Sequence, residues 1–320
     1  MEEMQVVLEN IAPDWRSLAE GAESLYAHME DCAILLLREQ EEMPSPTFFL
    51  EDAFVQSYRD LRRQLRTTPT ESAVGTGRAV ESTGRGLHAL CGAMLCRAML
   101  ARVSQETTLA EDVVLAGQED TEVILSQNRN RVVLLPNAMS TAALERFRRV
   151  LPALEQSACG DASEVCEEVY AGRAKYAILP IENSVDGVLK RFAAIIDRYE
   201  LKTVLTCSVQ DAEREQFTRF ALLSRGIETL DCGRQGAERF FSCNIYMTDP
   251  SHLFDVLAAA DYFGLRPVRV DSVPLAHNST GCTFSLVFLR TAGDDMVGFY
   301  CYLSLEQAGF LPSGNYTQLK

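Results

Sequence analysis

The sequence predicts a multidomain protein that combines α/β and α+β architecture: an N-terminal helical bundle, a short α/β lobe and a C-terminal ferredoxin-like domain. Three observations support this prediction. The first hundred residues repeat apolar side chains every three or four positions, which is typical of helices. Short β-like runs then alternate with helical segments from about residue 110, and a β-α-β-β order begins near residue 240. The expected domain boundaries are 1–108, 120–228 and 236–320.

Three helices are expected in the N-terminal section. Apolar residues recur from Leu18 to Leu36, and Pro44 and Pro46 end this first helix. Residues 52–66 predict a second amphipathic helix, and residues 87–103 predict a third that is apolar nearly all round and therefore buried. Acidic residues dominate the first helix and arginines the other two. These charges are either complementary solvated faces of a bundle or a grip for a dianion.

The middle section alternates strands and helices. A Ser/Thr start marks the helix at 140–150. Gly172 is a typical C-terminal stop for the helix at 162–171. Such alternation predicts a layered α/β domain. The expected strands are 123–125, 132–135, 176–180, 203–207 and 217–223, and the expected helices are 140–150, 162–171 and 188–199.

The last section predicts a ferredoxin-like domain. Its order is a strand at 240–247, a helix at 250–263 and strands at 268–273 and 283–289. The tail after Gly293 is expected to add a second helix and a closing strand. Within that tail, GFYCYLSL alternates aromatic residues, so its pattern fits either a helix or a strand.

Composition excludes several classes of function. The chain has 320 residues, 47% of them hydrophobic, and a net charge of −15, which disfavours nucleic acid and acidic membranes as partners. The longest apolar run near the front, 32–37, is far too short to span a bilayer, and no secretory signal is visible, so a cytoplasmic location is expected. None of the ten cysteines forms a CxxC pair and there are four histidines, so we expect buried thiols, no metal site and no cofactor.

Residues 176–187 read YAILPIENSVDG and carry the strongest functional signal. A buried strand that delivers polar residues at its carboxyl end is where α/β sheets place ligands. We expect Pro180 to stop the strand, with Glu182, Asn183 and Ser184 at the start of a helix whose free N–H groups favour an anion. The alternative is a plain helix cap made by Asn183 or Ser184, and the motif by itself leaves both interpretations open.

This motif resembles the PIENS segment of the prephenate dehydratase family. The later strand FTRFALL is similar to the family's N-x-TRF strand, with Gln216 in place of the Asn. The resemblance implies conversion of prephenate to phenylpyruvate, water and CO2, with Thr218 as the catalytic hydroxyl that helps the C4 hydroxyl of prephenate to depart. It also implies substrate contacts from Glu182, Asn183, Ser184, Arg219, Phe220, Ser140 and Thr141.

The C-terminal section resembles the ACT domain that dehydratases of this family commonly carry. PSHLFDV at 250–256, DSVP at 271–274 and SGNY at 313–316 occupy the positions of that domain's motifs, although Ser251, His252 and Val273 replace the family's Gly, Ala and Arg. The resemblance implies a regulatory module that pairs into a homodimer. Its expected ligand is a small aromatic-pathway acid or amino acid, held by His252, Leu253, Asp271, Ser272 and Pro274.

The N-terminal helices are similar in length pattern to a chorismate mutase-like domain, which often precedes the dehydratase. That family holds its substrate with arginines and a lysine, but residues 1–105 contain no lysine. Arg16, Arg38 and Arg59 are the remaining candidates. A helical scaffold without mutase activity is therefore expected.

Two departures from the dehydratase pattern define the shortened dehydratase-like lobe. VVLLPNAMST at 132–141 lacks the family's Gly-rich turn, and Ser184 and Thr218 are only 34 positions apart. That interval has room for one helix and one strand but not for the second lobe that separates these motifs in the family. Three hypotheses remain: a working dehydratase, a non-catalytic regulatory or amino-acid-sensing protein, and a protein with only mutase activity.

Overall fold

A computed structural model describes residues 52–67, 79–104, 128–211, 216–230, 232, 237–274 and 281–319. The helix expected from Leu18 to Leu36 and the strand expected at 123–125 lie outside these residues. The chain divides into two compact units. One unit joins the described part of residues 1–109 to Phe254–Tyr262 and Cys301–Glu306, and the other contains the remaining described residues.

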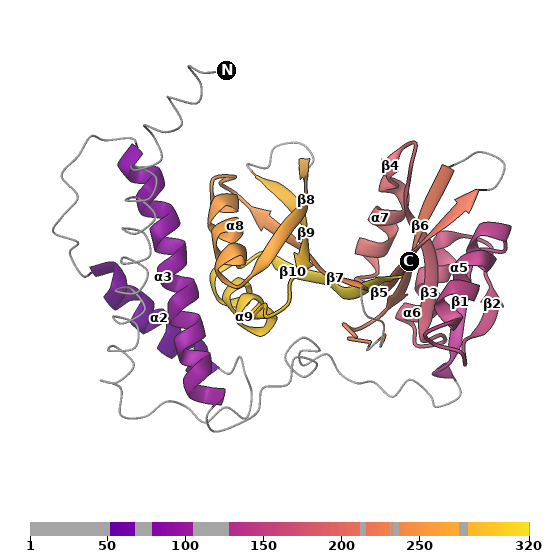
Figure 1. The fold of residues 1–320 in the computed structure, drawn as a ribbon, viewed down its shortest axis with the longest axis horizontal. Helices are drawn as coiled ribbons and strands as arrows, with labels where there is room; N and C mark the ends of the chain where they lie inside the picture. Colours follow the sequence, from indigo (N-terminus) through magenta and orange to yellow (C-terminus); the bar gives the residue numbers. More distant parts are fainter. Residues whose placement is uncertain are drawn as a thin grey trace, which may run out of the picture. The chain divides into compact units, whose positions relative to one another are not determined.

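The described residues form seven α-helices and ten β-strands, labelled in Figure 1. The helices are α2 (Asp52–Thr67), α3 (Ala79–Ser104), α5 (Ala138–Arg148), α6 (Ala162–Tyr170), α7 (Lys190–Arg198), α8 (His252–Tyr262) and α9 (Met296–Glu306). The strands are β1 (Arg131–Leu134), β2 (Glu155–Ala158), β3 (Tyr176–Asn183), β4 (Gly187–Val188), β5 (Lys202–Asp211), β6 (Gln216–Ser224), β7 (Glu238–Met247), β8 (Leu265–Pro274), β9 (Cys282–Arg290) and β10 (Phe310–Leu319).

All strands belong to one mixed sheet with the order β2-β1-β3-β6-β5-β10-β7-β9-β8, and β4 pairs with the end of β3. β1 runs parallel to both of its neighbours, β2 and β3. β6 is antiparallel to both of its neighbours, β3 and β5, whereas β10 joins β5 in parallel. The C-terminal strand therefore links the α/β strands to the antiparallel group β7, β9 and β8.

Helices cover both faces of the first half of this sheet. Ala143, Leu144 and Phe147 of α5 pack against one face, in a core with strand residues such as Leu134 and Leu222. The opposite face packs against α6 and α7. The sheet contributes Val133, Ala177 and Leu179 to this core, and the helices contribute Val165, Val169 and Ile196. The predicted layered α/β arrangement is thus present in this part of the chain.

The helix expected at 140–150 begins two residues earlier, at Ala138. Its N-cap is Asn137, whose Oδ1 accepts from the N–H of Ser140 at 2.8 Å, while the Thr141 hydroxyl donates to the Asn137 carbonyl at 3.0 Å. Ser140 and Thr141 therefore lie inside the first turn and do not cap the helix. Asn137 has the extended backbone that an N-cap requires, whereas Ser140 and Thr141 already have helical dihedrals. The helix therefore starts at Ala138 and not at Ser140.

The expectation that Pro180 ends its strand is wrong. β3 continues to Asn183, and the pairing with β6 shifts register between Pro180 and Glu182, which accommodates a residue that has no N–H to donate. After a short turn, Gly187 and Val188 pair back onto Asn183 and Glu182, and α7 starts only at Lys190. Glu182, Asn183 and Ser184 thus lie in a β-hairpin rather than at the start of a helix, and Leu189 precedes α7 without any side-chain cap.

The last section follows the order β7, α8, β8, β9, α9, β10, which extends the predicted β-α-β-β order. The ambiguous segment 298–305 is helical, within α9. Phe299 of this helix packs edge-on against Phe241 of β7 and Phe288 of β9, with ring centroids 6.1 Å and 5.2 Å apart. Aromatic burial explains why the alternating aromatic pattern forms a helix here, because tertiary packing overrides local propensity.

The helical unit contains a buried polar cluster. Glu306 Oε1 accepts from Arg62 Nε at 2.7 Å and from the Tyr58 hydroxyl at 2.5 Å, and that hydroxyl also lies 3.3 Å from the Gly92 carbonyl. The pKa of Tyr58 is raised well above its ordinary value, mainly by burial and secondly by the Glu306 charge. Arg97 of α3 lies over the Tyr262 ring, 5.6 Å from its centroid. Among the described helices, none has both the length and the apolar character needed to cross a membrane.

Candidate functional site

The dehydratase-like motifs meet at one edge of the sheet. β1 and β3 are parallel, so their carboxyl ends share an edge, and the first turn of α5 follows the carboxyl end of β1. β6 runs antiparallel to β3, which brings its beginning to the same edge. The topology thereby gathers Asn183, Thr218 and the start of α5, where α/β sheets commonly bind ligands.

The Asn183 side chain is committed to the turn between β3 and β4. Its Oδ1 accepts from the N–H of Val185 at 2.9 Å and of Asp186 at 2.5 Å, and its Nδ2 donates to Asp186 Oδ2 at 2.9 Å. Ser184 connects this turn to β6: its N–H donates to the Phe217 carbonyl and its hydroxyl accepts from the Phe217 N–H. The sequence ENSVD therefore builds a rigid hairpin in which the amide and the serine have structural partners.

Thr218 lies directly opposite Asn183 in the antiparallel pair, and directly opposite residues of such a pair project to the same face of the sheet. That face is the one covered by α5, because Phe220, two residues later, is buried in the core that α5 shares. Within the described part of the chain the Thr218 hydroxyl makes no hydrogen bond. Phe220 is buried and contributes packing rather than an exposed contact.

Ser140 lies on the buried side of α5, on this same face. It is fully buried, and its hydroxyl oxygen has no hydrogen-bond partner. Thr141 is exposed and bonded to the helix start. On this face the Asn183 amide and the Thr141 hydroxyl already have partners and Ser140 is fully buried, so among the described residues the half-buried Thr218 hydroxyl is the group of this set that can donate to a polar ligand.

The charged residues of the motifs lie on the other face. Glu182 is directly opposite Arg219, and its Oε2 is 2.8 Å from Arg219 Nη1, with both side chains about three-quarters buried (23% and 27% exposed). Since successive residues of a strand project to opposite faces, Thr218 and Arg219 cannot reach the same side of the sheet. The predicted substrate contacts therefore divide: Thr218 and Asn183 on the α5 face, Glu182 and Arg219 on the α6 and α7 face.

Two further residues, which the motifs did not single out for this edge, join Glu182 and Arg219. Arg269 of β8 places Nη1 3.7 Å from Glu182 Oε2 and Nε 3.1 Å from Asp271 Oδ2. Tyr316 of β10 lies within electrostatic reach of this group: burial raises its pKa, Arg269 and Arg219 act to lower it, and Glu182 acts to raise it. The sequence match of SGNY had already singled out Tyr316. No local signal in the sequence indicates that a side chain of β8 reaches a side chain of β3.

The residues expected to bind a regulatory ligand are spread over two elements. His252 and Leu253 form the first turn of α8, where His252 is exposed and Leu253 half-buried. Asp271 and Ser272 are exposed on β8, and Asp271 pairs with Arg269. The backbone of Pro274 ends β8.

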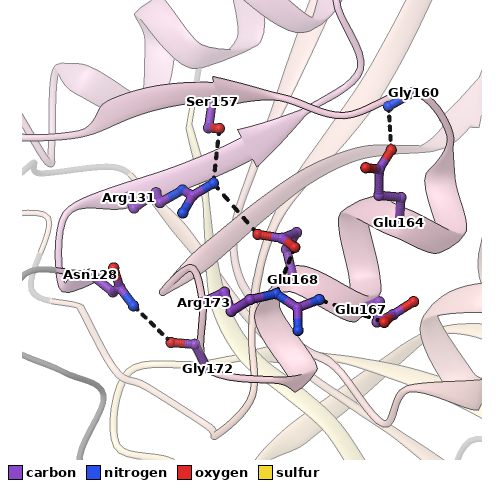
Figure 2. A network of polar contacts seen from close by, with 9 residues as sticks. All are labelled: Asn128, Arg131, Ser157, Gly160, Glu164, Glu167, Glu168, Gly172 and Arg173. Atoms are coloured by element: carbon purple, nitrogen blue, oxygen red, sulfur yellow. Dashed lines mark hydrogen bonds and ion pairs between the residues drawn. The ribbon is translucent and has the colours of Figure 1, made fainter.

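A separate polar network fastens α6 to the opposite end of β1 (Figure 2). Arg131 donates to the Ser157 hydroxyl of β2 at 3.1 Å and lies 3.5 Å from Glu168 of α6, which in turn accepts from Arg173 Nε at 2.7 Å. Arg131 is the first residue of β1, so this network lies at the far edge from Asn183 and Thr218. Its acids and bases pair with one another, which identifies it as scaffold.

Of the nine cysteines among the described residues, six are buried, as the sequence predicts, and Cys91, Cys232 and Cys282 are half-buried. Burial raises the pKa of Cys166 and of Cys207 to about 12, so both are protonated and poor nucleophiles at neutral pH. In the described portion of the chain, no three His, Cys, Asp or Glu side chains come together as a metal site.

Comparison with known proteins gives one family match. Residues 137–210 match the family model described as prephenate dehydratase. The match runs from the cap of α5 to the end of β5, so it includes Glu182, Asn183 and Ser184 and ends before Thr218. This segment is therefore prephenate dehydratase-like in sequence. A search of curated proteins finds no significant match.

Several solved structures are similar to part of the chain. The X-ray structure of prephenate dehydratase from Streptococcus mutans has a TM-score of 0.48 and 18% identity, over 59% of this chain and 99% of that chain. Prephenate dehydratase from Arthrobacter aurescens in complex with L-Phe gives 0.45 and 17%, over 58% and 89%. GqqA, described as a novel type of quorum quenching acylase, gives 0.45 and 19%, over 59% and 95%.

Proposed function

We propose that the chain is a prephenate dehydratase-like protein that binds a small aromatic-pathway acid or amino acid and has lost rapid dehydratase turnover. The prephenate dehydratase match over residues 137–210 supports the family. The observation that carries the loss of turnover is the short interval between the motifs, because Ser184 and Thr218 are only 34 positions apart. A substrate at Thr218 then lacks the wall of a second lobe, so the reacting groups are less well oriented.

The connection between the motifs supports the same proposal. β5 and β6 pair along their full lengths, from Lys202 opposite Ser224 to Asp211 opposite Gln216. Between Ser184 and Gln216 the described elements are β4, α7 and β5, so the chain has no room there for a second lobe. Without that wall a substrate at Thr218 stays solvated, which weakens both orientation and electrostatic stabilisation.

The test is phenylpyruvate formation from prephenate, followed by chromatography, with an intact two-lobed dehydratase as the positive control. We expect the rate to fall at least about 10²-fold below that control, the size of loss that misplacement of reacting groups causes. A rate equal to the control contradicts the proposal. Binding is measured in parallel by thermal shift with prephenate, chorismate, phenylpyruvate and phenylalanine, since a ligand at 100 times its Kd stabilises a protein by about 2.7 kcal/mol.

One observation favours a second candidate, a working dehydratase. Thr218 is directly opposite Asn183, and its hydroxyl has no competing partner within the described residues. If turnover persists, Thr218→Ala abolishes it and Thr218→Ser retains it, because the chemistry needs the hydroxyl and not the methyl group. Equal turnover by both variants excludes Thr218 as the catalytic residue.

The proposal includes a homodimer formed through residues 236–320, which follows from the ACT resemblance. Light scattering after size-exclusion chromatography measures the mass directly. A mass of 35.5 kDa, that of one chain, contradicts it.

A further inference from the structure

Two arginines converge on one carboxylate oxygen on the sheet face opposite Thr218. Glu182 Oε2 lies 2.8 Å from Arg219 Nη1 and 3.7 Å from Arg269 Nη1. Arg219 comes from β6 and Arg269 from β8, strands at different positions in the sheet order, so only the tertiary structure brings them together. Two guanidinium cations beside one carboxylate repel each other unless further acceptors surround them.

Both guanidinium groups have a buried donor left over. The Nε atoms of Arg219 and Arg269 are inaccessible to solvent and have no hydrogen-bond partner. Asp271 lies 3.1 Å from Arg269 Nε as an ion pair without hydrogen-bond alignment, and its side chain is about half exposed. A buried donor without an acceptor costs on the order of 1–3 kcal/mol, and a bidentate carboxylate is the acceptor that guanidinium geometry suits best.

A stacked aromatic pair lies on the neighbouring strands β10 and β7 of the same sheet. The rings of Tyr316 and Phe240 stack with centroids 5.5 Å apart and an interplanar angle of 22°. Both are half-buried and occupy adjacent positions on β10 and β7. Burial raises the pKa of the Tyr316 hydroxyl, and the charges of Arg269 and Arg219 act to lower it, so this hydroxyl lies within electrostatic reach of both cations.

We propose that Arg219 and Arg269 bind the carboxylate of a small aromatic acid whose ring packs beside Phe240 and Tyr316. The inference deepens the proposed function, on which it rests for the aromatic-pathway class of ligand, by placing its site on the face away from Thr218. Buried cationic donors without acceptors supply the affinity for the carboxylate, and the half-buried ring pair selects an aromatic group. Asp271 competes internally for Arg269 in the free protein.

The experiment is isothermal titration of the full chain with phenylpyruvate. Acetate, a carboxylate without a ring, and phenethylamine, a ring without a carboxylate, are the control probes. We expect phenylpyruvate to bind and both controls to bind at least 10-fold more weakly. In Arg219→Gln and Arg269→Gln the Kd for phenylpyruvate should rise at least 10-fold, about 1.4 kcal/mol each. Arg266→Gln, an exposed arginine three residues earlier on β8, is the matched control and should leave the Kd unchanged.

A variant of opposite direction separates binding from damage to the fold. Asp271→Asn removes the internal competitor and should tighten binding of phenylpyruvate, a result that simple destabilisation does not produce. Melting by circular dichroism checks that each variant folds, and Arg269→Lys replaces the glutamine variant if it does not. Phenylpyruvate binding that persists unchanged in both arginine variants overturns this site while the proposed binding function stands. No binding of phenylpyruvate to the native chain overturns the site, and the turnover assay is unaffected by either result.

Discussion

Replacing Glu306 with alanine should destabilise the helical unit by about 2–4 kcal/mol. Breaking a buried ion pair from one side costs roughly 3–5 kcal/mol because it leaves an uncompensated charge. Here Arg62 is 6% exposed, Tyr58 is 1% exposed, and both donate to the oxygen that the substitution removes. The Glu306 side chain itself is 16% exposed, and water entering there offsets part of the loss. Because of this exposure, we expect the loss of stability to stay below the top of the range of roughly 3–5 kcal/mol.

The assay is urea unfolding followed by circular dichroism at a helix-sensitive wavelength, with the midpoint and slope fitted separately. Asp60→Ala is the matched control, on the helix that carries Tyr58 and Arg62: its ion pair with Arg63 has a similar length, 2.9 Å, but the two side chains are 46% and 70% exposed. The control should change stability by no more than about 0.5 kcal/mol. Equal effects of Glu306→Ala and Asp60→Ala would refute the reasoning.

A double replacement sharpens the test. Arg62→Met with Glu306→Leu removes both charges and keeps apolar volume, so it should cost less than Glu306→Ala alone. The prediction also bears on the mutase-only hypothesis, since a fragment ending near residue 105 lacks Glu306 and the aromatic ring of Tyr262. Such a fragment should be less helical than residues 52–104 are in the full chain.

Three other predictions concern the α/β lobe and its junction with β10. Asn183→Ala should cost about 0.5–1.5 kcal/mol in urea unfolding, because two exposed backbone N–H groups of the hairpin exchange their side-chain acceptor for water; an unchanged midpoint would contradict the turn assignment. Gly314→Ala should destabilise by roughly 1–3 kcal/mol, since an added Cβ would lie 2.5 Å from the Thr203 carbonyl oxygen where β10 joins β5; a neutral effect would show that this junction can yield. Burial raises the pKa of Cys166 from its ordinary 9.0 to about 12, so the unfolded state loses the proton first. The stabilisation from the buried Cys166 thiol is fully present below pH 9 and is lost as the pH rises towards 12, by up to about 1.4 kcal/mol per pH unit; Cys166→Ala should flatten that slope.

The sequence predicted the local elements of the α/β lobe well. Apolar periodicity and end signals located α6 and the strand β6 to within two residues, because both signals depend on neighbours in the chain. It also predicted one helix and one strand in the interval before Thr218, although β5 extends to Asp211, beyond the expected 203–207. It misjudged the run through Pro180, because the register shift that tolerates a proline depends on how β3 pairs with β6.

The candidate site shows the same boundary between local and long-range information. By itself the sequence indicated PIENS and TRF as the candidate site and gave the interval between them, since motif order and length are properties of the chain alone. Only the tertiary structure decided that Thr218 joins the α5 face and Arg219 the α6 and α7 face, and that Arg269, 87 positions after Glu182 in the chain, reaches that carboxylate. The alternation of side chains is local, but strand pairing decides which face each side chain joins and what lies across from it.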